Sequence, residues 1–190
     1  MNRSWRILSF RSKRLHRPLQ RYASKFAGST PHHPVHTTAT VGHAIIAWIG
    51  TAITLGVLGW LSEATGAPLM LASFGASCVL LFGYPESQFS QPRNTLGGHL
   101  IAALIGLAMV STIGDHWLSM ALAVATAIAA MKLTHTVHPP AGSTAIIAVH
   151  LHPDATFLVL PILSGASLLV VLAALFNNVI EHRRYPVSWR

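Results

Sequence analysis

The sequence has little charge and almost no cysteine. Of its 190 residues, 9% are charged and five are acidic, whereas 52% are hydrophobic, and Cys78 is the single cysteine. Soluble domains carry charge on about a quarter of their residues, so this composition excludes an ordinary soluble domain and predicts an integral membrane protein. A single cysteine excludes an intrachain disulfide and a metal site made from cysteine pairs. The length suits about six membrane crossings with no separate soluble domain.

Negative charge is absent from the start of the chain, where positive charge is concentrated. Eight of the thirteen lysines and arginines lie in the first 25 residues, and no acidic residue precedes Glu63. Such charges beside a membrane domain favour anionic lipid headgroups over nucleic acid as partners, and they favour a cytoplasmic N-terminus. We therefore predict a basic cytoplasmic arm and linker over residues 1–40. An interfacial helix and an organelle targeting segment are both compatible with its composition.

Six apolar segments follow the arm. Because a hydrocarbon core about 30 Å thick requires about 20 helical residues, the first, third, fourth and sixth segments are long enough to cross it. The second and fifth are short or broken, and small and polar residues at 73–77 interrupt the second. We predict an all-α membrane protein with one transmembrane domain over residues 41–180, whose segments cover residues 41–61, 68–84, 95–113, 117–137, 141–150 and 155–179.

Positive residues outside the arm fit six crossings. With a cytoplasmic N-terminus, six crossings bring Arg93, Lys132 and Arg183 to the cytoplasmic side, together with the tail at residues 181–190, whereas four or five crossings bring fewer. We predict a bacterial inner membrane location, with a plastid membrane as the alternative. The small-residue helix faces are compatible with a homo-oligomer.

The fifth segment begins with a chain break. Two consecutive prolines at residues 139 and 140 cannot continue a helix, and the apolar stretch at residues 141–150 would span about 15 Å as a helix, half of the hydrocarbon core. Its first turn has two hydroxyl side chains and backbone N–H groups that we expect to be unpaired, which favours a small anion. The alternative is a proline-initiated helix whose hydroxyls bond only its own backbone.

A weak internal repeat links the two short segments. Residues 75–81 (GASCVLL) and 141–147 (AGSTAII) both place small residues and a serine before aliphatic residues. Each would be the middle of a three-segment half, residues 41–113 and 117–179, and an odd number of crossings inverts the halves relative to one another. In transporters and channels of that plan, the interrupted segments meet near the midplane and form the substrate site. The alternative is coincidence, because small residues are common in membrane helices.

Ionisable residues near the break are candidates for a site, because such groups at membrane depth are costly and normally face a cavity or a partner. Lys132, His135 and His138 share one helical face, although Lys132 can also extend to the headgroups. His138 could hydrogen-bond an anion, relay a proton or cap carbonyl groups. We expect His99, between glycines, to bond a serine on another helix or to line the path. The predicted substrate-binding residues are Ser73, Ser77, His99, Lys132, His135, His138, Pro139, Pro140, Gly142, Ser143 and Thr144.

The polar loop between the second and third segments is predicted to be structural. An ion pair between Arg93 and Glu86 and capping of the third helix by Asn94 with Thr95 would explain its composition. The predicted loop residues are Glu86, Ser87, Gln91, Arg93 and Asn94. The sequence has no nucleophile beside a base, no paired carboxylates, no metal-ligand spacing and no phosphate-binding loop, so we predict neither an enzyme nor a bound cofactor or metal.

Four longer motifs occur in order along the chain: FGASCVLLFG, YPES, QPRNTLGGHL and THTVHPPAGSTAI. They resemble the signatures of the HPP family of integral membrane proteins, named for the triplet at residues 138–140, and the resemblance covers residues 41–179. It implies a transporter-like protein, because plant plastid and cyanobacterial members are associated with nitrite movement across membranes. The positions that match the family motifs are Gly75, Ala76, Ser77, Pro85, Glu86, Ser87, Gln91, Pro92, Arg93, Asn94, Gly97, Gly98, His99, His138, Pro139, Pro140, Ala141 and Gly142.

The sequence therefore predicts a membrane channel or transporter for a small monovalent anion, with nitrite as the leading candidate. The anion would pass beside the break, exchanging its hydration for N–H and hydroxyl groups while His138 and Lys132 raise the local positive potential. One alternative is a pathway for a cation or neutral solute that uses carbonyl groups exposed by the prolines. The other is a non-transporting membrane scaffold or regulator whose basic arm binds a partner or anionic lipid.

Overall fold

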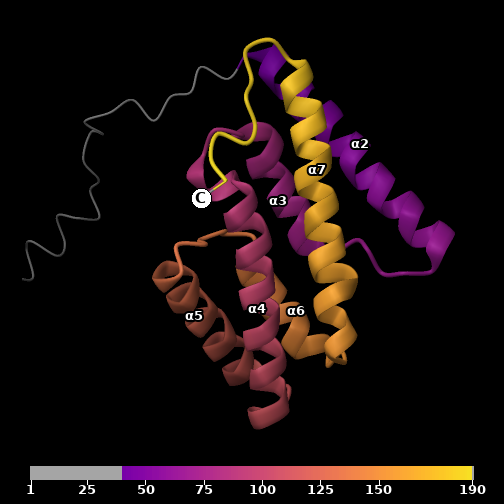
Figure 1. The fold of residues 1–190 in the computed structure, drawn as a ribbon. Coiled ribbons are helices and arrows are strands. Elements are labelled where there is room, and N and C mark those ends of the chain that lie inside the picture. The colour runs from indigo at the N-terminus through magenta and orange to yellow at the C-terminus, as the bar shows by residue number, and fades with distance from the viewer. Residues whose placement is uncertain (1–39, 190) are drawn as a thin grey trace, which may run out of the picture. The chain divides into compact units, whose positions relative to one another are not determined.

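The computed structural model describes residues 40–189, which form six α-helices and no β-strand (Figure 1). The predicted all-α class and the six apolar segments are confirmed for this part of the chain. The predicted basic arm, apart from its last residue, lies outside the described residues. The helices are α2 (Val41–Thr65), α3 (Ala72–Gly83), α4 (Pro92–Ile113), α5 (Trp117–Leu133), α6 (Ala141–Leu151) and α7 (Ser164–Val179).

Three described segments are long and apolar enough to cross a membrane: α2, α4, and the segment Ala155–Val179 that ends in α7. This last segment starts with a 3-10 turn, Ala155–Leu158, and a π-helical turn, Val159–Leu163. Helices α3, α5 and α6 are shorter, with 12, 17 and 11 residues. The predicted shortness of the second and fifth segments is thus confirmed. The predicted length of the fourth segment is wrong, because α5 ends at Leu133 and is shorter than the three candidate spans. The inverted relation between the two halves stays a prediction.

A non-helical stretch precedes each of the two shortest helices. Residues 66–71 lead into α3 and residues 134–140 lead into α6. Gly66, with φ 69°, ends α2 in the left-handed conformation that glycine adopts without strain, and the two prolines end the second stretch. The predicted interruption at residues 73–77 is wrong, because α3 runs through them. The Ser77 hydroxyl bonds the Ser73 carbonyl one turn earlier, which satisfies a polar side chain inside the helix.

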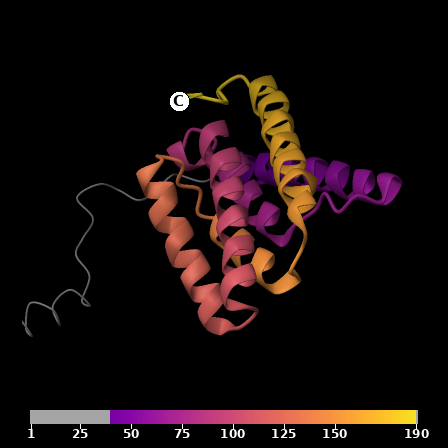
Figure 2. The same ribbon diagram turned by 60° about the horizontal axis from the view of Figure 1, so that its bottom comes forward.

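Helices α2, α3 and α7 pack through large side chains, and we call them the large-side-chain group. Their buried cluster includes Leu58, Phe74, Phe82 and Leu169, none of which has exposed surface. Figures 1 and 2 show α2 and α5 on opposite sides of the bundle, so α2 contacts this group and not α5.

Helices α4, α5 and α6 pack through small side chains, and we call them the small-side-chain group. Alanines dominate their buried cluster, among them Ala102, Ala123, Ala127 and Ala145. A Cβ atom at Gly106 of α4 would lie 2.7 Å from the carbonyl oxygen of Ala145 in α6. The two backbones therefore approach so closely that only glycine fits between them.

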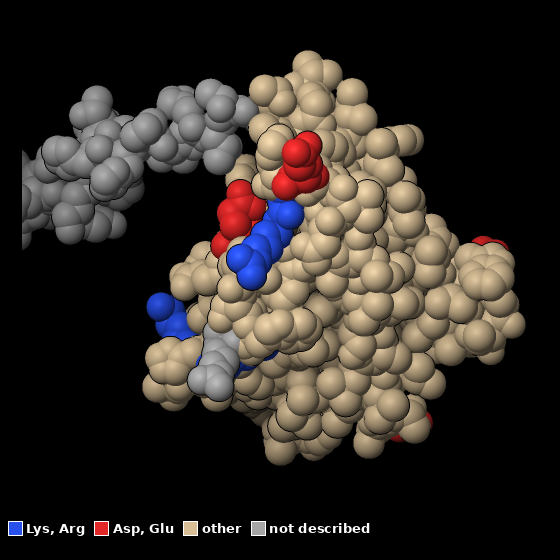
Figure 3. Space-filling view, turned by 45° about the horizontal axis from the view of Figure 1, so that its top comes forward, with Lys and Arg blue, Asp and Glu red and all other residues tan. Residues whose placement is uncertain are grey.

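The described lysines and arginines lie at the end of the bundle where α4 begins and where α5 and α7 end. They are Arg93, Lys132, Arg183 and Arg184. Figure 3 shows positive and negative side chains together on the face at this end, and further negative side chains only toward the right edge of the view. The turn between α4 and α5 at the opposite end contains Asp115.

Candidate functional site

Five polar side chains with no exposed surface meet inside the bundle. They come from α3, from α4, from the stretch before α6 and from α6, and we call them the buried polar chain. Its members are Ser73, Ser77, His99, His138 and Thr144. The sequence predicted all five as site residues, but it could not show that they form one connected group.

Ser77 is the centre of the buried polar chain. Its hydroxyl oxygen lies 2.9 Å from Nε2 of His99 and 2.9 Å from Nε2 of His138, so one serine joins the two histidines. The imidazole rings are 5.0 Å apart between centroids. Nδ1 of His138 donates a hydrogen bond to the carbonyl oxygen of Phe89, 2.7 Å away, because a carbonyl can only accept.

The other end of the buried polar chain joins the first turns of α3 and α6. Nδ1 of His99 lies 2.8 Å from the Thr144 hydroxyl, which lies 2.9 Å from the Ser73 hydroxyl. Ser73 is the second residue of α3 and Thr144 the fourth residue of α6. The beginnings of the two shortest helices therefore meet at this pair of hydroxyls. The Thr144 hydroxyl bonds another helix, which contradicts the alternative of hydroxyls that bond only their own backbone.

Glycines on α4 bring the break against the helix. A Cβ atom at Gly98 would lie 2.7 Å from the His138 Cβ, and one at Gly97 would lie 2.8 Å from the Thr136 Cγ2. The missing side chains thus provide the space in which His138 reaches Ser77. The Phe74 ring of α3 packs edge-on against His99, with ring centroids 5.1 Å apart. The aromatic contact of Phe74 therefore helps to fix the orientation of the His99 ring.

Side chains at the start of α4 hold the break in place. Nη2 of Arg93 donates to the Thr134 carbonyl and Nδ2 of Asn94 to the Val137 carbonyl, each at 2.8 Å. The predicted capping by Asn94 is wrong, because α4 begins at Pro92 and the asparagine side chain bonds the neighbouring stretch instead. Proline suits the first helical position because its missing N–H group would have no helical partner there.

Glu86 interacts electrostatically with Arg183 and not with Arg93, the predicted partner. It is exposed, and its charge counteracts the burial that lowers the pKa of Arg183. The guanidinium of Arg183 donates to the Phe82 carbonyl at 2.8 Å and to Oδ1 of Asn177 at 3.0 Å. Arg93 is directed to the break, so within the described residues its recorded partner is a carbonyl and not the Glu86 carboxylate.

The rest of the loop binds the C-terminal tail. Nε2 of Gln91 donates to the carbonyls of Pro85 and Ser87, and its Oε1 accepts from the backbone N–H of Val187 at 2.9 Å. The Ser87 hydroxyl accepts from the Phe89 N–H at 3.2 Å. Sequence reasoning missed Tyr185, whose hydroxyl donates to the Ser90 carbonyl at 2.9 Å. An aromatic residue shortly after the last apolar segment was the available signal.

The first-turn N–H groups of α6 are already bonded, so the prediction that they are unpaired is wrong. Those of Ala141, Gly142 and Ser143 donate to the carbonyls of residues 138, 139 and 140 at 3.0, 3.1 and 3.2 Å. The proline turn before the helix supplies these acceptors. Several other predicted residues lie outside the buried polar chain: Lys132, His135, Pro139 and Ser143 are exposed, Gly142 is half-buried, and Pro140 is buried.

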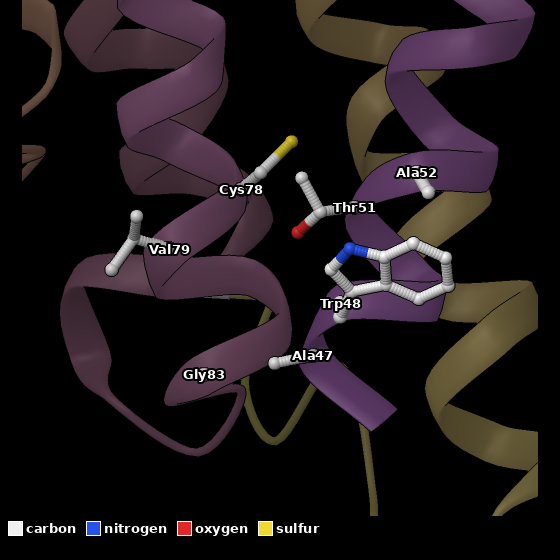
Figure 4. A pocket seen from close by; sticks show the side chains of 7 residues that line it. All are labelled: Ala47, Trp48, Thr51, Ala52, Cys78, Val79 and Gly83. Atoms are coloured by element: carbon white, nitrogen blue, oxygen red, sulfur yellow. The ribbon is translucent and has the colours of Figure 1, made fainter. Parts of the chain in front are cut away.

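A pocket of about 420 Å³ lies between α2 and α3. Its lining is mostly apolar, and Figure 4 shows the side chains of Thr51 from α2 and Cys78 from α3 in the space between the two helices. The lining contains no member of the buried polar chain. It therefore offers an apolar surface and no polar group from the predicted site.

The fold and the buried polar chain define a class: a helical membrane protein that holds two hydrogen-bonded histidines in its interior. The chain belongs to the HPP family of membrane proteins, because residues 36–186 match the family described as HPP, transmembrane region. The predicted family is thus confirmed.

Two curated relatives come from Dictyostelium discoideum, and both are named as transmembrane proteins. One is 33% identical over 172 residues, which cover 85% of this chain and 60% of the relative. The other is 38% identical over 128 residues, which cover 63% of this chain and 41% of the relative. The chain thus spans about half the length of these two relatives. No solved structure matches it.

Proposed function

We propose that this protein transports a small monovalent anion, with nitrite as the leading candidate, and that the buried polar chain is the substrate-contacting part of its pathway. The observation that carries the proposal is the pair of fully buried histidines that Ser77 joins inside an otherwise apolar bundle. Ionisable side chains at membrane depth are costly, and they are retained where a pathway or a relay uses them.

The position of the buried polar chain favours an anion over a cation as the substrate. Ser73 and Thr144 lie in the first turns of α3 and α6, and the dipole of each helix adds partial positive charge at that end. Because the first N–H groups of α6 are bonded, the hydroxyl and imidazole donors are the groups available to an anion, once it displaces their present partners.

Because the buried polar chain is fully buried, we favour a transporter that changes conformation and not an open pore. None of the five side chains has exposed surface, so a solute reaches them only after an element moves. The buried polar chain lies between the two helix groups. Ser73 and Ser77 belong to α3 in the large-side-chain group. His99 and Thr144 belong to α4 and α6 in the small-side-chain group. Separation of the groups would open the site without unfolding either one.

The predicted inverted repeat agrees with this proposal. In each half a first helix, α2 with 25 residues or α5 with 17, is followed by a non-helical stretch, a shorter helix and a long segment. The two short helices would then enter the membrane from opposite sides and meet at their beginnings, as in transporters built from inverted repeats. The end with Arg93, Lys132 and Arg183 would face the cytoplasm of a bacterial cell, where the basic arm would bind anionic headgroups.

The test is nitrite flux into liposomes that contain the purified chain, compared with nitrate, formate and chloride. We expect flux for the wild type, a loss of most flux for His138→Ala, and unchanged flux for His135→Ala, the matched control at an exposed histidine outside the chain. Absence of flux of every anion in folded, inserted protein would overturn the proposal. Flux of a cation instead would support the pathway lined by carbonyl groups.

A further inference from the structure

The donors and acceptors of the buried polar chain can be arranged in two directions. The two arrangements differ by one bound proton. Five links run from Phe89 through His138, Ser77, His99 and Thr144 to the Ser73 hydroxyl. Each serine or threonine hydroxyl supplies one proton, and a neutral imidazole supplies one. In both directions the Ser77 proton goes to an imidazole nitrogen at 2.9 Å, in place of the longer 3.1 Å bond to the Ser73 carbonyl. The Phe89 carbonyl can only accept, so Nδ1 of His138 always donates a proton to it. The number of protons that the other four hydrogen bonds need follows from this.

In the first direction Thr144 donates to Ser73, as the structure has it. Nδ1 of His99 must then donate to Thr144, so its Nε2 must accept from Ser77. Ser77 has no second proton for His138, so the remaining link is filled only when His138 itself donates from Nε2 as well as from Nδ1. An imidazole with protons on both nitrogens carries one positive charge.

In the second direction every donor between Ser73 and His138 is reversed. Ser73 then donates to Thr144, Thr144 to His99, His99 to Ser77, and Ser77 to Nε2 of His138, with both imidazoles neutral. The two states interconvert when one proton reaches the Ser73 hydroxyl and each donor passes its own proton to the next, along links of 2.8–2.9 Å. Each transfer breaks and forms one O–H or N–H bond. The added proton stays on the Ser73 hydroxyl, His138 receives the proton of Ser77, and the net positive charge is then on His138.

The added charge has no counter-charge in its surroundings. Among the described residues, the groups that face the two imidazoles are neutral: Ser77 and Phe74 from α3, Thr144 from α6, and the Phe89 carbonyl from the loop. Arg93 and Lys132, the nearest charged residues in sequence to the two histidines, are positive, and Lys132 is exposed. A buried charge without a partner is strongly unfavourable, whereas a charge with an anion beside it is much less so.

From this geometry we infer that the buried polar chain binds one proton together with one anion, so that the two cross the membrane as an electrically neutral pair. The inference rests on the proposed anion transport. Because each ligand lowers the cost of burying the other, proton binding and anion binding strengthen each other reciprocally. The exposed His135 lies outside the chain and has no part in this coupling.

The test uses liposomes that contain the full chain, a lumenal pH dye and an inward nitrite gradient near neutral pH. Protein-free liposomes correct for nitrous acid that crosses the lipid unaided, and a potassium gradient with valinomycin sets the membrane potential. We expect the lumen to gain one proton for each nitrite, at a rate that the potential does not change. His135→Gln is expected to retain this ratio.

Ser77→Ala removes the link between the two histidines and is expected to lower the ratio of protons to nitrite toward zero. Nitrite uptake by the wild type that follows the potential and leaves the lumenal pH unchanged would overturn the coupling but not the transport. Absence of nitrite uptake above the protein-free rate would overturn both. An unchanged ratio in folded Ser77→Ala would overturn the assignment to this chain. The wild-type ratio is decisive without any variant.

Discussion

The two helix groups are held together by different means. In the large-side-chain group, α2, α3 and α7 contact each other through Leu58, Phe74, Phe82 and Leu169. In the small-side-chain group, α4, α5 and α6 contact each other through alanines, and their backbones approach closely at Gly106. In a membrane, apolar side chains gain little by leaving lipid, so both groups depend on packing contacts. Large side chains can adjust their rotamers, whereas backbones in contact cannot.

This difference bears on where the bundle can move. Ser73 and Ser77 come from the large-side-chain group, and the two histidines and Thr144 lie with the small-side-chain group. The buried polar chain therefore crosses the boundary between them. At this boundary the hydrogen bonds lie beside a buried apolar cluster that includes Ala103, Ala148 and Ile162. The hydrogen bonds can be exchanged for bonds to a substrate, whereas apolar packing has no such replacement.

The largest expected effect is from Leu169→Ala in α7, within the large-side-chain group. Leu169 is fully buried, and its truncation leaves a cavity and removes packing contacts. We expect a loss of about 2–3 kcal/mol in the free energy of unfolding, the low end for such a change because the transfer from lipid contributes little. Equilibrium unfolding in mixed micelles measures it. Leu175→Ala, at a position 65% exposed on the same helix, is the control and should be nearly neutral.

Gly106→Ala tests the small-side-chain group and is expected to cost somewhat less, about 1–3 kcal/mol. The new methyl group would lie 2.7 Å from the Ala145 carbonyl oxygen, which is backbone and cannot turn aside. Gly50→Ala makes an equally short contact, 2.5 Å, but with the Phe82 ring, which can rotate, so it should cost less than Gly106→Ala. If the two substitutions cost the same, the distinction between the groups is wrong.

Gly56→Ala is the matched control for both glycine substitutions. No atom lies within 4 Å of the new methyl group, and the residue is in the interior of α2. Alanine in a helix interior is favoured over glycine by about 0.5–1 kcal/mol, so this variant should be equal to or more stable than the wild type. The same unfolding measurement in mixed micelles applies.

The sequence predicted the elements well because its hydropathy and prolines determine them locally. The boundaries Val41, Ile113 and Trp117 agree with the structure, and the prolines at 139 and 140 end the non-helical stretch before α6. The interruption predicted at residues 73–77 was wrong, because small and polar residues fit a helix that is packed against other helices. Hydropathy does not separate a broken segment from a short one.

The members of the site were predicted, but their partners were not. Residue type marked His99 and His138 as unusual in an apolar bundle, whereas the link through Ser77 depends on how α3 and α4 pack. The acceptor at Phe89 is a backbone carbonyl, which no sequence pattern identifies. The same is true of the carbonyls that occupy the first N–H groups of α6, and that is why the predicted free donors there were wrong.

The smallest expected effects come from two side chains that fix the surroundings of His138, one on α4 and one in the tail after α7. Asn94 of α4 donates to the carbonyl before His138, and Tyr185 after α7 donates to the carbonyl after Phe89. Burial raises the pKa of Tyr185, so its hydroxyl stays protonated and able to donate. Asn94→Ala and Tyr185→Phe each remove one bond and should each cost about 1 kcal/mol in the free energy of unfolding.

The two variants should differ in transport, although their stabilities are similar. Asn94→Ala frees the stretch that carries His138, so we expect it to reduce nitrite flux in liposomes more than Tyr185→Phe, which acts on His138 only through the loop at residues 88–91. Equal loss of flux in both would mean that the position of the Phe89 carbonyl matters as much as the position of the histidine. In that case the C-terminal tail positions His138 as directly as α4 does.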